Sequence, residues 1–171
     1  IMTAAEWAYL DALEDDSATE DSNAQMNATL VVLDGTGTSV RYLAGMRNRG
    51  NGSRSHRPHN QRINLPHDAP WQGNTALNVN AQKPYSQVLG SAIFRYADVP
   101  AADATQVRLL INGTNHAHAG DDMYGYYAWL EALDSEMVDN HWPDDSSGDL
   151  WKVNYFGSSG DDNELEYWGE A

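Results

Sequence analysis

The sequence predicts an α+β domain with a mainly antiparallel sheet and a few short helices. Its 171 residues are 41% hydrophobic and include six Trp and nine Tyr, which is enough apolar material for one folded domain with a core. Runs that alternate in polarity or are rich in β-branched residues are separated by turn sequences, such as residues 34–37 (DGTG) and 112–113 (NG). Turn signals between short runs of this kind are typical of antiparallel strands.

Local signals assign the elements in chain order. Thr3 and Glu6 form a capping-box pattern, and Trp7 and Leu10 follow at helical spacing, so a first helix is expected over residues 4–14. A β-hairpin is expected next, leading into an arginine-rich loop. The expected strands are 27–33, 39–46, 62–65, 76–80, 105–111, 123–130 and 150–153, and further helices are expected at 84–97 and 133–141.

In two of these elements the pattern also predicts which face is buried. On strand 62–65, Arg62 and Asn64 share one face, while Ile63 and Leu65 share the face expected to meet the core. In helix 84–97 the apolar residues fall on one stripe, which is likewise expected to be core. These residues are Val88, Leu89, Ala92, Ile93 and Tyr96.

The charge distribution predicts an anion site. The formal net charge is −15, yet residues 41–62 hold six of the ten Lys and Arg residues, and no Asp or Glu lies between Asp34 and Asp68. An acidic chain with a pI near 4.4 repels polyphosphate backbones, so nonspecific nucleic-acid binding is not expected. A pocket for a single anionic ligand is compatible with this composition.

The spacing of the arginines supports such a pocket. Arg47 and Arg49 are two apart, so a strand would place both guanidinium groups on one face. Residues 50–53 (GNGS) follow, and their glycines allow positive φ and a close approach of backbone N–H groups to a ligand. Arg54 adds a further set of donors suited to phosphate or carboxylate. The alternative is a solvated turn whose arginines balance the acidic surface.

Other polar clusters give weaker metal signals. His56, His59 and His67 fit no standard zinc spacing and are expected to be surface residues. The acidic segments 14–21 and 144–149 suggest a calcium-dependent binding module as a third and weaker reading of the chain, and solvated loops explain them better. The ligands of any metal stay unassigned. The absence of cysteine excludes disulfides. The sequence contains no run of about 18 apolar residues, so no membrane-spanning helix is expected.

Residues 47–54 (RNRGNGSR) and 62–65 (RINL) together resemble the R-x-R/K-G-N-x-S … K-x-P-x-K-L signature of the spore coat protein H-like (CotH) kinase family. Later segments follow in the family's order, and the resemblance covers roughly residues 26–153. These segments are 77–80 (LNVN), 107–113 (VRLLING), 124–127 (YGYY) with Glu131 and Asp134, and 148–152 (GDLWK). Arg62 stands where the family often has Lys, and Asn64 stands where it often has Asp.

The resemblance implies the N-terminal part of an atypical kinase-like fold that binds ATP with Mg²⁺ or Mn²⁺. It implies a set of cofactor-binding residues, which are Arg47, Arg49, Asn51, Ser53, Arg54, Arg62, Glu131 and Lys152. The family's catalytic and metal-binding Asp and Asn residues lie beyond the segment that matches residues 148–152, so no catalytic residue is assigned here. We therefore expect the nucleotide-binding half of a protein kinase, and expect the chain, which begins at Ile1, to be a processed or partial product.

Two functions of different classes follow. In the first, the chain is part of a CotH-like protein kinase that phosphorylates Ser or Thr of secreted or coat proteins. In the second, it is a noncatalytic structural module of an extracellular matrix or spore coat that assembles with itself. Both place it outside the cell or at the cell or spore surface. The expected organisation is a helix and acidic linker at 1–25, the kinase-like region at 26–156, and an acidic tail or the start of a missing C-terminal half at 157–171.

Overall fold

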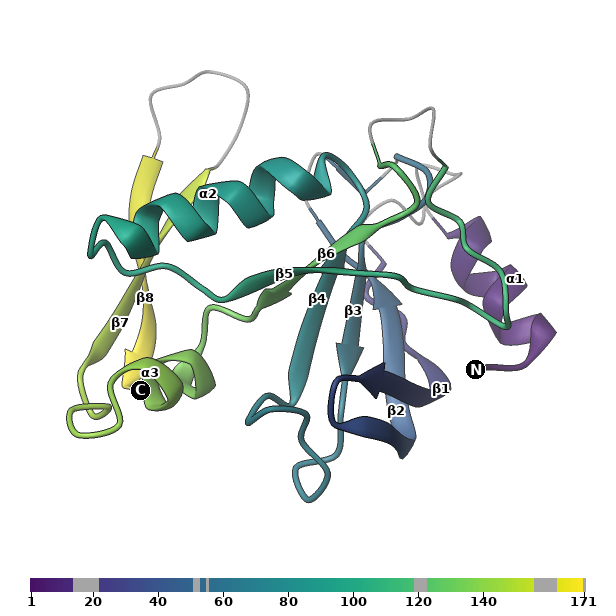
Figure 1. The fold of residues 1–171 in the computed structure, drawn as a ribbon, viewed down its shortest axis with the longest axis horizontal. Helices are drawn as coiled ribbons and strands as arrows, with labels where there is room; N and C mark the ends of the chain where they lie inside the picture. Colours follow the sequence, from purple (N-terminus) through teal and green to yellow (C-terminus); the bar gives the residue numbers. More distant parts are fainter. Residues whose placement is uncertain (14–21, 51–52, 55, 119–122, 156–162, 171) are drawn as a thin grey trace. The chain divides into compact units, whose positions relative to one another are not determined.

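The computed structural model describes residues 1–13, 22–50, 53–54, 56–118, 123–155 and 163–170, with backbone only after Trp151. The chain divides into two compact units, Ile1–Glu131 and Ala132–Ala171 (Figure 1). The structure confirms the expected α+β class with a mainly antiparallel sheet and short helices.

The first unit is built on one curled sheet of six antiparallel strands in the order β1-β2-β3-β4-β6-β5. The strands are β1 (Met26–Asp34), β2 (Gly37–Asn48), β3 (Gln61–Asn64), β4 (Ala76–Asn80), β5 (Ala104–Val107) and β6 (Tyr127–Glu131). Helix α1 (Ala4–Ala12) precedes the sheet, and helix α2 (Pro84–Tyr96) connects β4 to β5 and runs alongside β5 and β6 (Figure 1).

The first helix begins as its sequence predicts. The Thr3 side chain accepts a hydrogen bond from the Glu6 amide, and the Glu6 carboxylate accepts one from the Thr3 amide. Leu10 is completely buried, and its carbonyl accepts a hydrogen bond from Asn48 Nδ2 at 2.9 Å. This contact between buried groups joins α1 to the end of β2.

The hairpin of β1 and β2 turns where the sequence indicates. Asp34 Oδ1 accepts hydrogen bonds from the Thr36 amide and hydroxyl at 2.8 and 2.6 Å, which closes the tight turn. Between Ala28 and Leu30 the register of the pair shifts, and Leu43 on β2 has a φ of 59°. An irregularity of this kind bends a strand pair and contributes to the curl of the sheet.

The register separates a polar row from an apolar row across the sheet. Arg47 pairs with Arg62, and Arg62 pairs with Asn78, so these side chains lie on one face. The neighbouring row belongs to the other face and joins Met46, Ile63 and Leu77, all buried in the core. The predicted division of strand 62–65 is therefore confirmed, because Ile63 and Leu65 are buried while Arg62 and Asn64 are half-buried.

The prediction that the apolar stripe of helix 84–97 is core is wrong. Leu89, Ile93 and Tyr96 are 60%, 56% and 94% exposed, and Ala92 is also exposed. The helix packs along β5 and β6 instead through a more polar side, where Ser91 donates a hydrogen bond to the Ala102 carbonyl at 2.5 Å. Periodicity identified the helix correctly but could not tell which side the sheet would cover.

Two strands differ from their expected bounds. β5 ends at Val107 rather than near residue 111, and β6 begins at Tyr127 rather than at 123. Before β6, Tyr124 and Gly125 have φ values of 54° and 79°, which are incompatible with strand geometry. At its other end β6 includes Glu131, which is its last residue and does not lie beyond the strand as expected.

The second unit contains α3 (Ser135–His141) and an antiparallel ribbon of β7 (Asp149–Tyr155) and β8 (Asn163–Glu170). In this ribbon the Lys152 backbone pairs with Glu166. The sequence predicted α3 and β7 but left the region of β8 unassigned. Among the helices of the described residues, none is long and apolar enough to cross a bilayer.

Candidate anion-binding site

Four of the arginines that the sequence predicts to bind an anion or cofactor lie together at the polar face of the sheet. Arg47 on β2 and Arg62 on β3 are direct cross-strand partners, and Arg49 is the first residue after β2. Arg54 completes the group, because its charge, like that of Arg62, lowers the pKa of both Arg47 and Arg49. Burial is the first cause of both lowered pKa values, and repulsion among these arginines adds to it, which indicates that the four guanidinium groups lie near one another.

Arg49 is the most constrained of these cations. Its Nη1 donates to Asn80 Oδ1 on β4, and Asn80 Nδ2 donates in turn to Gln87 Oε1 on α2 at 2.7 Å. Burial, followed by repulsion from Arg62, Arg47 and Arg54, lowers the pKa of Arg49 to about 10. The side chain still carries its charge at neutral pH, and its contacts in the described chain are with neutral oxygens.

Arg47 shows the same pattern at a shallower position. Its Nη1 donates to Asn23 Oδ1 at 2.9 Å and to the Asn48 carbonyl at 3.2 Å. Burial first, and then repulsion from Arg62 and Arg54, lowers the pKa of Arg47. Within the described residues, no carboxylate offsets the charge of Arg47 or Arg49.

Arg54 has a structural role in the loop that follows β2. Its Nε donates to the Gly50 carbonyl at 2.8 Å, while Nη1 and Nη2 donate to the Ser22 carbonyl and to Asn23 Oδ1 at 2.6 and 2.8 Å. Arg54 therefore holds the loop against the segment that precedes β1. Arg47 and Arg54 share Asn23 Oδ1 as an acceptor, which brings their guanidinium groups to the same point.

Gly50 adopts the positive φ that the sequence suggests, and Ser53 makes a contact close to it. Gly50 has a φ of +125°, and a Cβ placed there would lie 2.5 Å from Ser53 Oγ. Ser53 Oγ accepts a hydrogen bond from Asn60 Nδ2 at 3.1 Å. Asn51 lies outside the described residues, as does Gly52.

Arg62 is oriented along its own strand. Its Nε donates to Asn64 Oδ1 at 2.9 Å, and Asn64 Nδ2 donates to Gln25 Oε1. Beside Arg62, Asn78 Oδ1 is buried and has no hydrogen-bond partner in the described chain. That oxygen is a candidate acceptor for a hydroxyl or amino group of a ligand.

Two of the predicted cofactor-binding residues, Glu131 and Lys152, are not placed with the four arginines. Glu131 pairs with Leu77 and so lies on the core face of the sheet, opposite the arginines. Its Oε2 accepts a hydrogen bond from the Asp103 amide at 3.1 Å, which ties the end of β6 to the start of β5. Lys152 belongs to the second unit, where the structure describes its backbone alone.

One expectation for the histidines is corrected. His56 and His67 are exposed as expected, but His59 is only 3% exposed. Its ring nitrogens lie 2.6 Å from the Arg54 carbonyl and 3.3 Å from the Asp11 carbonyl, so it packs the arginine loop against the end of α1. Segment 14–21, which suggested calcium, lies outside the described residues.

Sequence reasoning missed the amides that position the arginines. Asn80 and Gln87 hold Arg49, and Asn23 holds Arg47 and Arg54. The available signal was the pair Asn78 and Asn80, two amides on one face of an otherwise apolar strand. Comparison of the chain with protein-family models and with curated proteins found no match.

Proposed function

We propose that the first unit binds the phosphates of ATP as the nucleotide-binding part of a CotH-like protein kinase. The observation that carries the proposal is the grouping of Arg47, Arg49 and Arg62 on one face of the sheet, with no described carboxylate balancing Arg47 or Arg49. Folding brings like charges together against their repulsion, and a polyanion would relieve that repulsion. Planar guanidinium groups also bind phosphate oxygens in pairs.

The arrangement gives each arginine a distinct role in this proposal. Arg49 is the fixed cation, because the hydrogen bonds through Asn80 to Gln87 tie its position to both β4 and α2. Arg62, which is aligned by Asn64, adds a cation on β3 next to Arg47 on β2. Arg54 shapes the loop and adds charge beside the site, since three of its nitrogens already have acceptors.

A functional analogy with protein kinases supports this assignment. In those enzymes a lysine on a strand is held by a glutamate of the following helix and binds the nucleotide phosphates. Here the strand β4 precedes α2, and the amides of Asn80 and Gln87 form the bond between strand and helix. The neutral pair replaces the ion pair, and Arg49 supplies the positive charge. The analogy concerns roles, not descent.

The proposed site accounts for nucleotide binding and not for phosphoryl transfer. Mg²⁺ or Mn²⁺ bound with ATP would neutralise phosphate charge, and it takes carboxylate or amide oxygens as protein ligands. The described residues that contact Arg47 and Arg49 offer amides and no carboxylate. Transfer to Ser or Thr of a secreted or coat protein is accordingly proposed for a larger protein that contains this unit.

Calorimetric titration of ATP with Mg²⁺ or Mn²⁺ tests the proposal. The wild-type chain is compared with an Arg47→Ala/Arg49→Ala variant whose fold is verified by circular dichroism. Arg57→Ala is the matched control, because Arg57 comes from the same basic stretch but is exposed and paired with Asp11 at 2.7 Å. Saturable binding by wild type and control, lost in the double variant, is expected. Absence of binding by the folded wild-type chain overturns the proposal.

A second candidate is a noncatalytic coat or extracellular module that assembles with itself. The exposed apolar face of α2 favours it, since Tyr85, Leu89, Ile93 and Tyr96 form one unburied stripe. Sedimentation equilibrium of the wild-type chain and of a Leu89→Asp/Ile93→Asp variant tests this function. Concentration-dependent assembly that the variant loses supports it, and a monomeric wild-type chain at the highest concentration contradicts it.

A further inference from the structure

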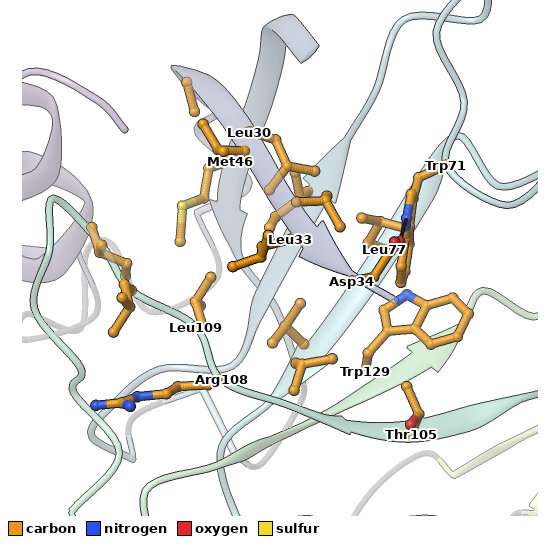
Figure 2. Close-up of a pocket in the computed structure, with 18 of the residues that line it drawn as sticks. Leu30, Leu33, Asp34, Met46, Trp71, Leu77, Thr105, Arg108, Leu109 and Trp129 are labelled. Carbon is orange, nitrogen blue, oxygen red and sulfur yellow. Dashed lines mark hydrogen bonds between the residues drawn. The ribbon is translucent and has the colours of Figure 1, made fainter. Parts of the chain in front are cut away.

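The core face of the sheet, opposite the arginines, contains a large cavity. Its volume is about 1050 Å³, and its walls come from all six strands and from residues 108–111, which follow β5. Figure 2 shows side chains from these segments converging on one space. Representative wall residues are Leu30, Met46, Leu77, Val79, Leu109 and Trp129.

The walls are mainly apolar, as in small-molecule sites. Ligand pockets in proteins are typically about 300–1,000 Å³ and combine apolar walls with a few polar groups. Native cores, in contrast, are packed with few voids larger than a water molecule. This space is accessible to solvent, because Leu33 and Leu110 in its wall are 80% and 47% exposed, while Met46, Leu77 and Trp129 form its buried side. Its size and apolar lining are those of a site that a small molecule can enter.

One buried polar group in the wall lacks a partner. Trp129 is 6% exposed, and its Nε1 has no hydrogen-bond acceptor in the described chain. Figure 2 shows this nitrogen on the side of the indole that faces Asp34 and the cavity. The adjacent Trp71, which meets Trp129 edge to face, differs because its Nε1 donates to Asp34 Oδ2 at 3.3 Å. Trp129 thus offers one free N–H donor to a ligand.

Four charged residues line the wall, and two of them, Arg95 and Asp103, form an ion pair with each other. The other two define an orientation. Arg108 is exposed and makes no hydrogen bond or ion pair with the residues that the structure describes, and its guanidinium lies away from Trp129 (Figure 2). Asp34 lies near Trp129, where it would repel an anion. A ligand with one anionic end would place that end at Arg108 and extend its neutral part toward Trp129.

We propose that the cavity binds one elongated apolar carboxylic acid that carries a neutral oxygen along its chain, as in an oxygenated long-chain fatty acid. The carboxylate pairs with Arg108, the hydrocarbon contacts Leu30, Leu77 and Leu109, and the internal oxygen accepts from Trp129 Nε1. The site is separate from the arginine cluster, because Met46 and Ile63 face the cavity while Arg47 and Arg62 face the other way.

Calorimetry with defined fatty acids below their micelle concentrations tests this site. The probes are octadecanoate, its 9-, 10- and 12-hydroxy derivatives, and the methyl ester of each. Binding of one molecule per chain is expected, with at least one hydroxy acid about threefold or more tighter than octadecanoate because it satisfies Trp129. The esters are expected to bind about tenfold more weakly because they lack the charge.

Variants separate the contributions. Arg108→Glu is expected to weaken acid binding about tenfold and leave the esters unchanged. Lys83→Glu makes the same charge change at an exposed residue outside the cavity and is expected to have no effect. Trp129→Phe is expected to remove the preference for the hydroxy acid while octadecanoate still binds, and the Arg108 and ester comparisons decide the matter if this variant does not fold.

The outcomes of this test and of the nucleotide test are distinguishable. Arg47→Ala/Arg49→Ala is expected to leave fatty-acid binding unchanged. If none of the probes binds the wild-type chain with one-to-one stoichiometry, or if esters bind as tightly as acids, the proposed site is refuted.

Discussion

Replacing Arg49 with glutamine is expected to stabilise the protein while abolishing anion binding. Arg49 is charged at neutral pH although burial and three neighbouring arginines oppose that charge. Removing the cation relieves both penalties, and a glutamine amide can still donate a hydrogen bond toward Asn80. A residue retained for ligand binding at a cost to stability is a recognised feature of functional sites.

The lowered pKa gives the size of the effect. An ordinary arginine titrates above about 12, and each pKa unit corresponds to about 1.4 kcal/mol. With its pKa at about 10, charged Arg49 costs the folded state roughly 3 kcal/mol below pH 10. The glutamine makes a weaker hydrogen bond to Asn80 than the arginine does, which offsets about 1 kcal/mol of this gain. Arg49→Gln should therefore raise the free energy of unfolding by about 1–2 kcal/mol.

Scanning calorimetry at pH 7 and low ionic strength measures this change. A gain of that size corresponds to a rise in Tm of roughly 2–8 °C for a chain of this length. Arg57→Gln is the control of opposite sign, because it breaks an exposed ion pair with Asp11 and should cost no more than about 1 kcal/mol. A variant Arg49→Gln less stable than wild type by 1 kcal/mol or more would refute the idea that the arginine is electrostatically strained.

Three further changes test the fold around the site. Gly50→Ala should cost about 1–3 kcal/mol in urea unfolding, since φ is +125° and the new Cβ meets Ser53, whereas Gly35→Ala, which has open space, should be nearly neutral. Asn48→Ala should cost about 2–3 kcal/mol in the same assay, because it leaves the buried amide of Gln61 without its acceptor; an unchanged midpoint would contradict this. Burial raises the pKa of Tyr127 to about 12, so its stabilising contribution is complete below pH 10 and is lost as pH rises from 10 to 12. In an Arg49→Gln background, Tyr127→Phe should reduce this alkaline decline by up to about 1.4 kcal/mol per pH unit, and equal slopes would count against it.

The elements were predictable where a local signal determines them. The capping box of Thr3 and Glu6 set the start of α1, and the Asp34 side chain set the hairpin turn. The covered side of α2 was not predictable, because it depends on how the chain returns from β4 to β5 rather than on the helix sequence. The positive φ of Tyr124, which delays β6, likewise has no clear marker in the sequence.

The site divides in the same way. Strand alternation correctly predicted that Arg62 would lie away from the core, and the pairing of Arg62 with Arg47 extends the polar row. The placement of Glu131 required the register between β4 and β6, and a shift of one residue would have moved it to the arginine face. The bond between Asn80 and Arg49 joins residues 31 positions apart and needs the assembled sheet.

The two proposed sites use the same strands, and the alternation of side chains keeps them chemically independent. On β2 and β3, Arg47 and Arg62 belong to one face and Met46 and Ile63 to the other. A substitution at an arginine can therefore alter phosphate binding without changing a cavity wall.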